Sequence, residues 1–185
     1  MNTVSAIEIC SRALILLGHS PIASFDEPGA GAQVSSAFYE SSLNSLINSH
    51  RWNFTKKKAE LNRLVATPLN DWDYQYQLPT DYINMIKTAD DSDYDIQQDK
   101  LLSNQTSLEI DYIFRPEETQ FPPLFTETLE FYLAAKFAIP VTDSKTFAEV
   151  YIGFYNQQVK KAKAVDSQSV PANQLNETYY NQIRQ

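Results

Sequence analysis

The sequence contains only one cysteine, two histidines and four glycines among its 185 residues. A single cysteine, Cys10, excludes an internal disulfide framework and a metal site built from several cysteines. Two histidines leave little material for zinc chemistry. The four glycines cannot form either of the common phosphate-binding loops, because both loop motifs need further glycines at fixed offsets. The composition fits a reducing compartment and offers no standard nucleotide or zinc site.

Long apolar runs and positive charge are also scarce. No run approaches the ~20 apolar residues of a membrane-spanning helix, and the apolar stretch over residues 13–18 lacks a basic leader and a cleavage motif. We therefore expect neither a membrane anchor nor a standard secretion signal. Fifteen Lys and Arg against 23 Asp and Glu give a net charge of -8. This balance argues against a protein that grips nucleic acid phosphates over a broad basic face.

Apolar and aromatic side chains are plentiful. Hydrophobic residues make up 43% of the chain and aromatic residues 12%. A chain of this length can build one sizeable core, so a single domain is expected. Aromatic side chains combine a large contact area with a low ordering cost, and they are enriched at protein interfaces. The composition is a first indication of an assembly protein.

Apolar residues recur at helical spacing in four segments, which predicts helices over residues 3–18, 29–50, 122–139 and 143–165. Ser5 and Glu8 have the spacing of a capping box at the first of these helices. Pro140 is expected to end the third helix. We expect the first two helices to pack as a hairpin. The predicted apolar side of the last helix consists of Phe147, Val150, Tyr151, Phe154 and Tyr155.

Residues 52–115 have a different pattern, with short alternating or β-rich stretches that prolines interrupt. They predict a small antiparallel sheet, including a strand over residues 108–114 whose face with Glu109, Asp111 and Ile113 is mostly in water. Residues 166–185 are rich in Asn, Gln and Ser and cannot build a core. We therefore predict an α+β fold over residues 1–165: mainly a helical bundle with an inserted small antiparallel β region, followed by an extended C-terminal tail.

An acidic run near residue 95 has part of the spacing of an EF-hand calcium loop. The sixth position holds Ile96 where the motif needs glycine, and the twelfth holds Leu102 where it needs a bidentate Glu. We therefore interpret the run as a solvated loop and expect no metal site. The aspartates that match the motif are Asp91, Asp93, Asp95 and Asp99.

Four glutamates allow an enzymatic interpretation. Glycoside hydrolysis needs two carboxylates at a set separation, but an acidic domain offers such pairs by chance. Helix spacing also puts Glu127 and Glu130 on one solvated face. The glutamates are Glu117, Glu118, Glu127 and Glu130.

The histidines and a lysine run have simple structural interpretations. His19 follows Gly18 and His50 ends the second predicted helix, where a histidine commonly packs at a turn or a helix end. The run over residues 56–58 follows Trp52 and resembles the basic, aromatic pattern of single-strand binders. In a strand its three lysines split between two faces, so a charged edge that resists aggregation is the better interpretation. Arg51 or these lysines could still meet an acidic partner surface.

Several stretches carry a family resemblance, and they occur in order over most of the chain through residue 165. They are residues 6–18, HRWNF at 50–54, WDYQYQLPTD at 72–81, FPPLF at 121–125 and LAAK at 133–136. In these stretches the chain resembles the tail tubular protein A family of short-tailed bacteriophages. None of the stretches is a catalytic motif, so the likeness is one of packing pattern.

The resemblance implies a structural virion protein that serves as the head-to-tail adaptor. It implies a dodecameric ring of identical subunits between the portal protein and the tail nozzle protein, with tail fibres as a further partner. The genome would pass through the ring without specific binding, and the protein would be found in the virion tail and, during assembly, in the host cytoplasm. It implies no catalytic residue, no cofactor, no metal and no membrane partner.

The polar tail lies outside the resemblance. A tail that cannot fold alone can order along a neighbour, so we expect residues 166–185 to dock on the portal. The expected apolar anchors are Tyr179, Tyr180 and Ile183.

The sequence is also compatible with two other functions. The first is a tail accessory protein with peptidoglycan hydrolase activity, with Glu117, Glu118, Glu127 or Glu130 as acid or base. The second is a connector adaptor of the long-tailed phage type, which shares a helical bundle but usually lacks a β insertion as large as residues 52–114.

Overall fold

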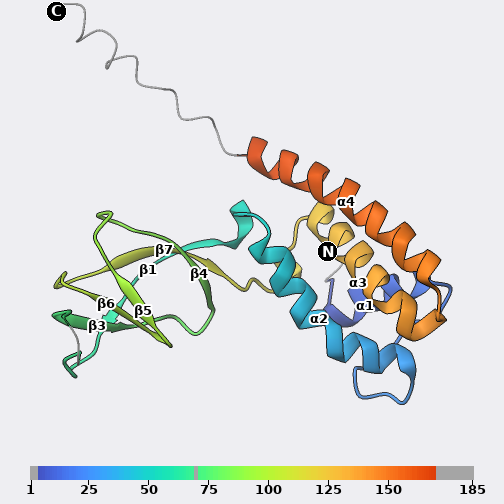
Figure 1. The fold of residues 1–185 in the computed structure, drawn as a ribbon, viewed down its shortest axis with the longest axis horizontal. Coiled ribbons are helices and arrows are strands. Elements are labelled where there is room, and N and C mark those ends of the chain that lie inside the picture. Colours follow the sequence, from blue (N-terminus) through green and yellow to red (C-terminus); the bar gives the residue numbers. More distant parts are fainter. Residues whose placement is uncertain (1–3, 69–70, 170–185) are drawn as a thin grey trace, which may run out of the picture.

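The computed structural model describes residues 4–68 and 71–169, and it has an α+β fold. The helices gather at one end of an elongated molecule, and two antiparallel sheets form the other end (Figure 1). The predicted α+β class is therefore confirmed. No helix within these ranges has the length and apolar character needed to cross a membrane.

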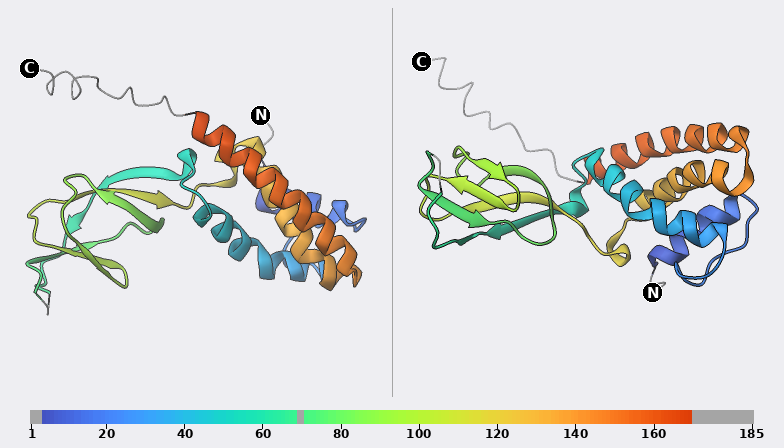
Figure 2. Two further views of the ribbon diagram at one scale, coloured as in Figure 1. Left: turned by 45° about the horizontal axis from the view of Figure 1, so that its top comes forward. Right: turned by 60° about the horizontal axis from the view of Figure 1, so that its bottom comes forward.

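The central helix is α3 (Pro123–Thr142), because it packs against each of the other three. These are α1 (Ala6–Leu16), α2 (Ala30–Asn48) and α4 (Lys145–Gln168). Both views of Figure 2 show α3 between α2 and α4. The helices α1 and α2 contact each other, as in the predicted hairpin. Each of them, however, packs more extensively on α3 than on the other.

The helix ends differ from the prediction in identifiable ways. α1 begins at Ala6 because the Ser5 hydroxyl accepts a hydrogen bond from the Glu8 N–H at 3.2 Å. α3 does not end before Pro140. Proline removes one backbone donor, but the Asp143 N–H still donates to the Ile139 carbonyl at 2.9 Å and completes the last turn.

The last helix also runs past its predicted end at residue 165. α4 continues to Gln168, and the Asp166 carboxylate accepts a hydrogen bond from the Asn53 N–H at 3.1 Å. The predicted start of the tail, residue 166, therefore lies inside a helix that is tied to the body of the protein.

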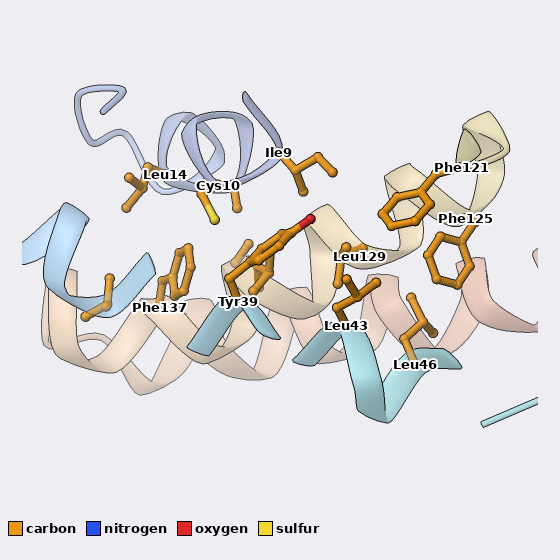
Figure 3. Packing of buried hydrophobic residues seen from close by; sticks show 14 of the residues in the cluster. Ile9, Cys10, Leu14, Tyr39, Leu43, Leu46, Phe121, Phe125, Leu129 and Phe137 are labelled. Carbon is orange, nitrogen blue, oxygen red and sulfur yellow. The ribbon is translucent and has the colours of Figure 1, made fainter. Parts of the chain in front are cut away.

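The core of the helical part is formed by apolar side chains from α1, α2 and α3 (Figure 3). Cys10 lies in this core, where burial raises its pKa to about 12 and keeps the thiol protonated. The labelled core residues are Ile9, Cys10, Leu14, Tyr39, Leu43, Leu46, Phe121, Phe125, Leu129 and Phe137.

The β region has two sheets where the sequence predicted one. The first sheet has the order β1-β7-β4, with β1 (Lys56–Glu60), β7 (Glu109–Phe114) and β4 (Tyr82–Thr88). The second has the order β2-β3-β6-β5, with β2 (Asn62–Arg63), β3 (Tyr74–Gln77), β6 (Lys100–Ser103) and β5 (Asp95–Gln97). All pairings are antiparallel, as expected.

The two sheets enclose a second apolar core, and β7 contributes to both cores. Ile110 and Tyr112 point into the core between the sheets. Ile113 points the other way and is only 4% exposed, because it packs on the helical core. The prediction that Ile113 lies on a wet face was therefore wrong: the second face of this strand meets the helices.

Trp52 connects α2 to the sheets. Its indole is buried, donates a hydrogen bond from Nε1 to the Leu46 carbonyl at 2.9 Å, and meets the Phe125 ring edge-on at 5.1 Å. A short 3₁₀ turn (Asn53–Thr55) follows and leads directly into β1. A large buried aromatic group at this point fixes the direction in which the chain leaves the helical part.

Candidate functional site

One side of α4 exposes large apolar side chains. Phe147, Val150 and Phe154 are 43%, 43% and 46% exposed. Their spacing of three and four residues places them in one row along the helix. We call these three residues the α4 stripe. They belong to the predicted apolar side of this helix. Tyr151 and Tyr155 of that side contact other helices, whereas the three stripe residues remain largely in solvent.

The α4 stripe is held in place by aromatic contacts with α3. Phe154 lies 5.7 Å from Phe131, measured between ring centroids, and Tyr155 stacks on Tyr132 at 4.7 Å. The Tyr151 hydroxyl donates to the Leu16 carbonyl at the end of α1. The stripe is thus a fixed surface, because its backbone is anchored on two other helices.

Glu118 belongs to an ion-pair network between α2 and the end of β7. It accepts a hydrogen bond from the Tyr39 hydroxyl at 3.0 Å and pairs with Arg115 at 2.7 Å. Arg115 also pairs with Glu40 at 2.8 Å. Burial pushes the pKa of Glu118 up, but the bonds and charge of Arg115, with help from Tyr39, outweigh it and hold the pKa below its usual range. An ionised, paired carboxylate of this kind serves as a structural contact.

Glu130 lies in a separate network on α3. It pairs with Arg12 at 3.2 Å, and Arg12 also pairs with Glu8. Burial raises the pKa of Glu130, and the nearby charge of Glu127 adds to the shift against the opposing effect of Arg12. Of the four glutamates, the structure therefore brings together Glu127 and Glu130.

The other two glutamates of the enzymatic interpretation are placed differently. Glu117 is exposed, and Glu118 is committed to Arg115. Glu127 accepts a hydrogen bond from Gln158 of α4. Three of the four carboxylates thus have partners that explain them without catalysis.

The histidines take structural places. The Nε2 atom of His50 lies 3.4 Å from the Asp166 carboxylate, and its ring meets Trp52 edge-on at 5.0 Å. His19 contacts the Ser20 carbonyl through Nδ1 at 3.2 Å. His50 thus helps to hold the end of α4 against the α2–β1 connection.

The lysine run forms the edge strand β1, and its side chains divide between the two faces of the sheet. Lys57 pairs with Asp81 at 2.7 Å and lies over the Phe114 ring, whereas Lys58 faces Asp111 at 3.4 Å. A surface hollow of about 350 Å³ lies beside the strand. It is lined by Arg51, Lys56, Lys57, Lys58, Ile86 and Asp111.

The acidic run spans the β4–β5 connection, β5 and the turn between β5 and β6, where Asp99 lies. Asp91 adopts a left-handed conformation (φ 48°), and Asp91, Asp93 and Asp99 are exposed. Among the residues that the structure describes, no group of three or more His, Cys, Asp or Glu side chains is arranged to hold a metal ion. The expected portal-docking residues, Tyr179, Tyr180 and Ile183, lie outside the described residues.

Sequence reasoning missed the arginines that organise both carboxylate networks. Arg12 stands four residues after Glu8, and Arg115 stands three residues before Glu118. The first spacing is one at which side chains on a helix meet, so a search for such pairs could have found Glu8 and Arg12, whereas Arg115 lies outside any helix and its pairing with Glu118 has no helical signal. The long-range partners, Glu130 and Tyr39, have no such signal.

Comparison of the chain with protein-family models and with curated proteins finds no match.

Proposed function

We propose that this chain is a structural virion protein, the head-to-tail adaptor of a short-tailed bacteriophage. In this proposal identical copies form a ring between the portal and the tail nozzle. The observation that carries it is the α4 stripe: a row of exposed aromatic and aliphatic side chains on a long helix that is anchored on α3 and α1. Such side chains are typical of the buried centre of a protein interface.

The charge of the chain fits a ring through which a genome passes. The net charge is -8, and affinity for nucleic acid scales with the number of phosphates that cationic groups neutralise. A channel lined by carboxylates repels a polyanion and lets it slide. We therefore propose that DNA moves through the ring without being held by it.

The portal contact is proposed for the end of the chain. Removing residues 170–185 tests it better than removing residues 166–185, because Asp166 accepts hydrogen bonds from Asn53 and belongs to α4. A second variant keeps the full length and replaces only Tyr179, Tyr180 and Ile183 with alanine, which separates the role of these side chains from the length of the tail.

The experiment measures co-sedimentation with portal rings purified from the phage that encodes this chain, with electron microscopy of the pelleted complexes. The full chain should form a ring on the portal, and both altered chains should lose attachment at least tenfold. Unchanged attachment of the truncated chain would refute the docking role of the tail. A full chain that ignores portal rings would refute the adaptor function itself.

The ion pairs of Glu118 and Glu130 favour this structural role over hydrolysis of peptidoglycan. A zymogram with purified peptidoglycan separates the two functions. We expect no clearing by the unaltered chain. Clearing that disappears in Glu130→Gln or Glu127→Gln, but persists in Glu117→Gln, would replace the adaptor proposal by an enzymatic one.

A further inference from the structure

The outer faces of α2 and α4 lie on opposite sides of α3 (Figure 2). A ring needs two different, mutually complementary surfaces on each copy, because a head-to-tail contact pairs one surface with the other. The placement of α2 and α4 meets the geometric part of this requirement. The side chains of the two faces must also complement each other.

The exposed face of α4 is apolar and belongs to a helix with a net positive charge. The α4 stripe supplies Phe147, Val150 and Phe154. Within α4, four lysines stand against Glu149 and Asp166, which leaves a net charge of +2 in a chain whose total is -8. One of these lysines, Lys161, is exposed and continues the row of the stripe, seven residues after Phe154.

The outer face of α2 carries small or uncharged side chains and one carboxylate, Glu40, whose side chain is 61% exposed and pairs with Arg115. No lysine or arginine occurs between residues 13 and 50, where Asp26, Glu27 and Glu40 give a charge of -3. The small exposed side chains at Ala37, Ser41 and Ser45 follow a four-residue ridge, and such a ridge lets the large side chains of another helix approach closely.

We propose that the α4 stripe of one copy packs on the outer face of α2 in the next copy, between Ala37 and Asn48. This inference rests on the proposed ring and names the surfaces that build it. Large apolar side chains meet small ones, and a helix with a net charge of +2 meets a face whose one charged side chain is the partly exposed carboxylate of Glu40. The same two faces then repeat around the ring.

The size of this contact sets its strength. The stretch of α2 from Ala37 to Asn48 has 12 residues and is about 18 Å long. At a helix width of about 10 Å, the pair covers roughly 180 Å² in projection on each copy. Stable interfaces bury about 800 Å² per partner. We therefore expect weak, concentration-dependent association of free copies, which a chemical cross-link can trap.

The experiment uses single cysteines on the two faces and a short bismaleimide. Gln157→Cys places an exposed thiol beside Phe154, and Ser41→Cys places one on α2. Asn156→Cys is the matched control, because residue 156 is exposed on the side of α4 turned away from the stripe. Cys10 can stay, since its buried thiol is protonated and inert.

A mixture of the Gln157→Cys and Ser41→Cys chains, one of them tagged, should give a dimer in at least fivefold higher yield than the mixture that contains Asn156→Cys. Adding Val150→Glu should reduce the yield about tenfold, and Asn156→Glu should leave it unchanged. Cross-linking of the Gln157→Cys chain with itself would show pairing of α4 with α4 and overturn the proposal, as would equal yields for the two mixtures.

The cross-linking experiment and the portal experiment test different claims. A chain that forms rings on portals without the α4–α2 cross-link refutes this interface and leaves the adaptor function standing. A chain that gives the cross-link but ignores portals keeps the interface and loses the adaptor function.

Discussion

Glu118 and Glu130 lie in opposite electrostatic environments within the same helical part. Arg115 stabilises the ionised form of Glu118, whereas burial disfavours the ionised form of Glu130. The two residues therefore contribute to stability with opposite dependence on pH, because a shifted pKa changes the free energy of unfolding. Substitution by glutamine keeps the shape of each side chain and removes its charge.

Glu118→Gln should lower the free energy of unfolding at pH 7 by about 1 kcal/mol, the net scale of one intramolecular hydrogen bond after exchange with solvent. The pKa of Glu118 is lowered in the folded state, so its stabilising effect is present above the ordinary value of 4.5 and is lost as the pH falls through the lowered pKa. Urea unfolding at several pH values measures this. A difference from the unaltered chain that does not shrink below pH 4.5 would contradict the assignment.

Glu130→Gln should show the reverse trend. The pKa of Glu130 is raised, so the stabilising effect of its proton is present below the ordinary value of 4.5 and is lost as the pH rises through the raised pKa. At pH 7 the variant should therefore be as stable as the unaltered chain or more stable, by up to about 1 kcal/mol. The gain should disappear in the same urea series as the pH approaches 4.5. A loss at pH 7 would show that the pair with Arg12 dominates.

At the scale of elements, the last turn of α3 contains a proline. Pro140 is exposed and has no N–H to donate to the carbonyl four residues earlier. Pro140→Ala restores this bond and should raise the free energy of unfolding by about 1–3 kcal/mol. Ile139→Ala, at an exposed neighbour, is the control and should change it by less than about 0.5 kcal/mol. If Pro140→Ala is destabilising, the proline acts by restricting the unfolded chain.

The elements that the sequence predicted well are those with a local signal. The four helices lie where apolar periodicity placed them, and the Ser5 cap is confirmed. Pro140 misled because a proline in the last turn removes only one backbone donor, and the Asp143 N–H still closes the turn on the Ile139 carbonyl. The pattern of apolar residues does not show whether the turn that contains a proline still closes.

The elements that the sequence could not place depend on tertiary contacts. Alternation assigned Ile113 to the solvent face, but the helical core covers that face. The division of the β region into two sheets follows from pairing between distant strands such as β3 and β6. The candidate site shows the same limit: the α4 stripe has a clear sequence pattern, but its exposure is set by how much of α4 the other helices cover.

At the scale of the whole molecule, two apolar cores share one sheet. The helical core and the core between the sheets meet at β7, where Ile113 points to one and Tyr112 to the other. Proteins open locally in cooperative units that often coincide with such substructures. We therefore expect the second sheet to open without unfolding the helices, while the first sheet is held from both sides.

Tyr76→Ala tests this expectation in the core between the sheets. Tyr76 is fully buried on β3, so the substitution should remove about 3–5 kcal/mol from the stability of that core. Hydrogen exchange measured by mass spectrometry should then show faster exchange in β3 and β6 and unchanged exchange in α3. Leu133→Ala, at a fully buried position of α3, is the matched control and should speed exchange in the helices first. Equal acceleration everywhere in either variant would mean that the two cores unfold as one unit.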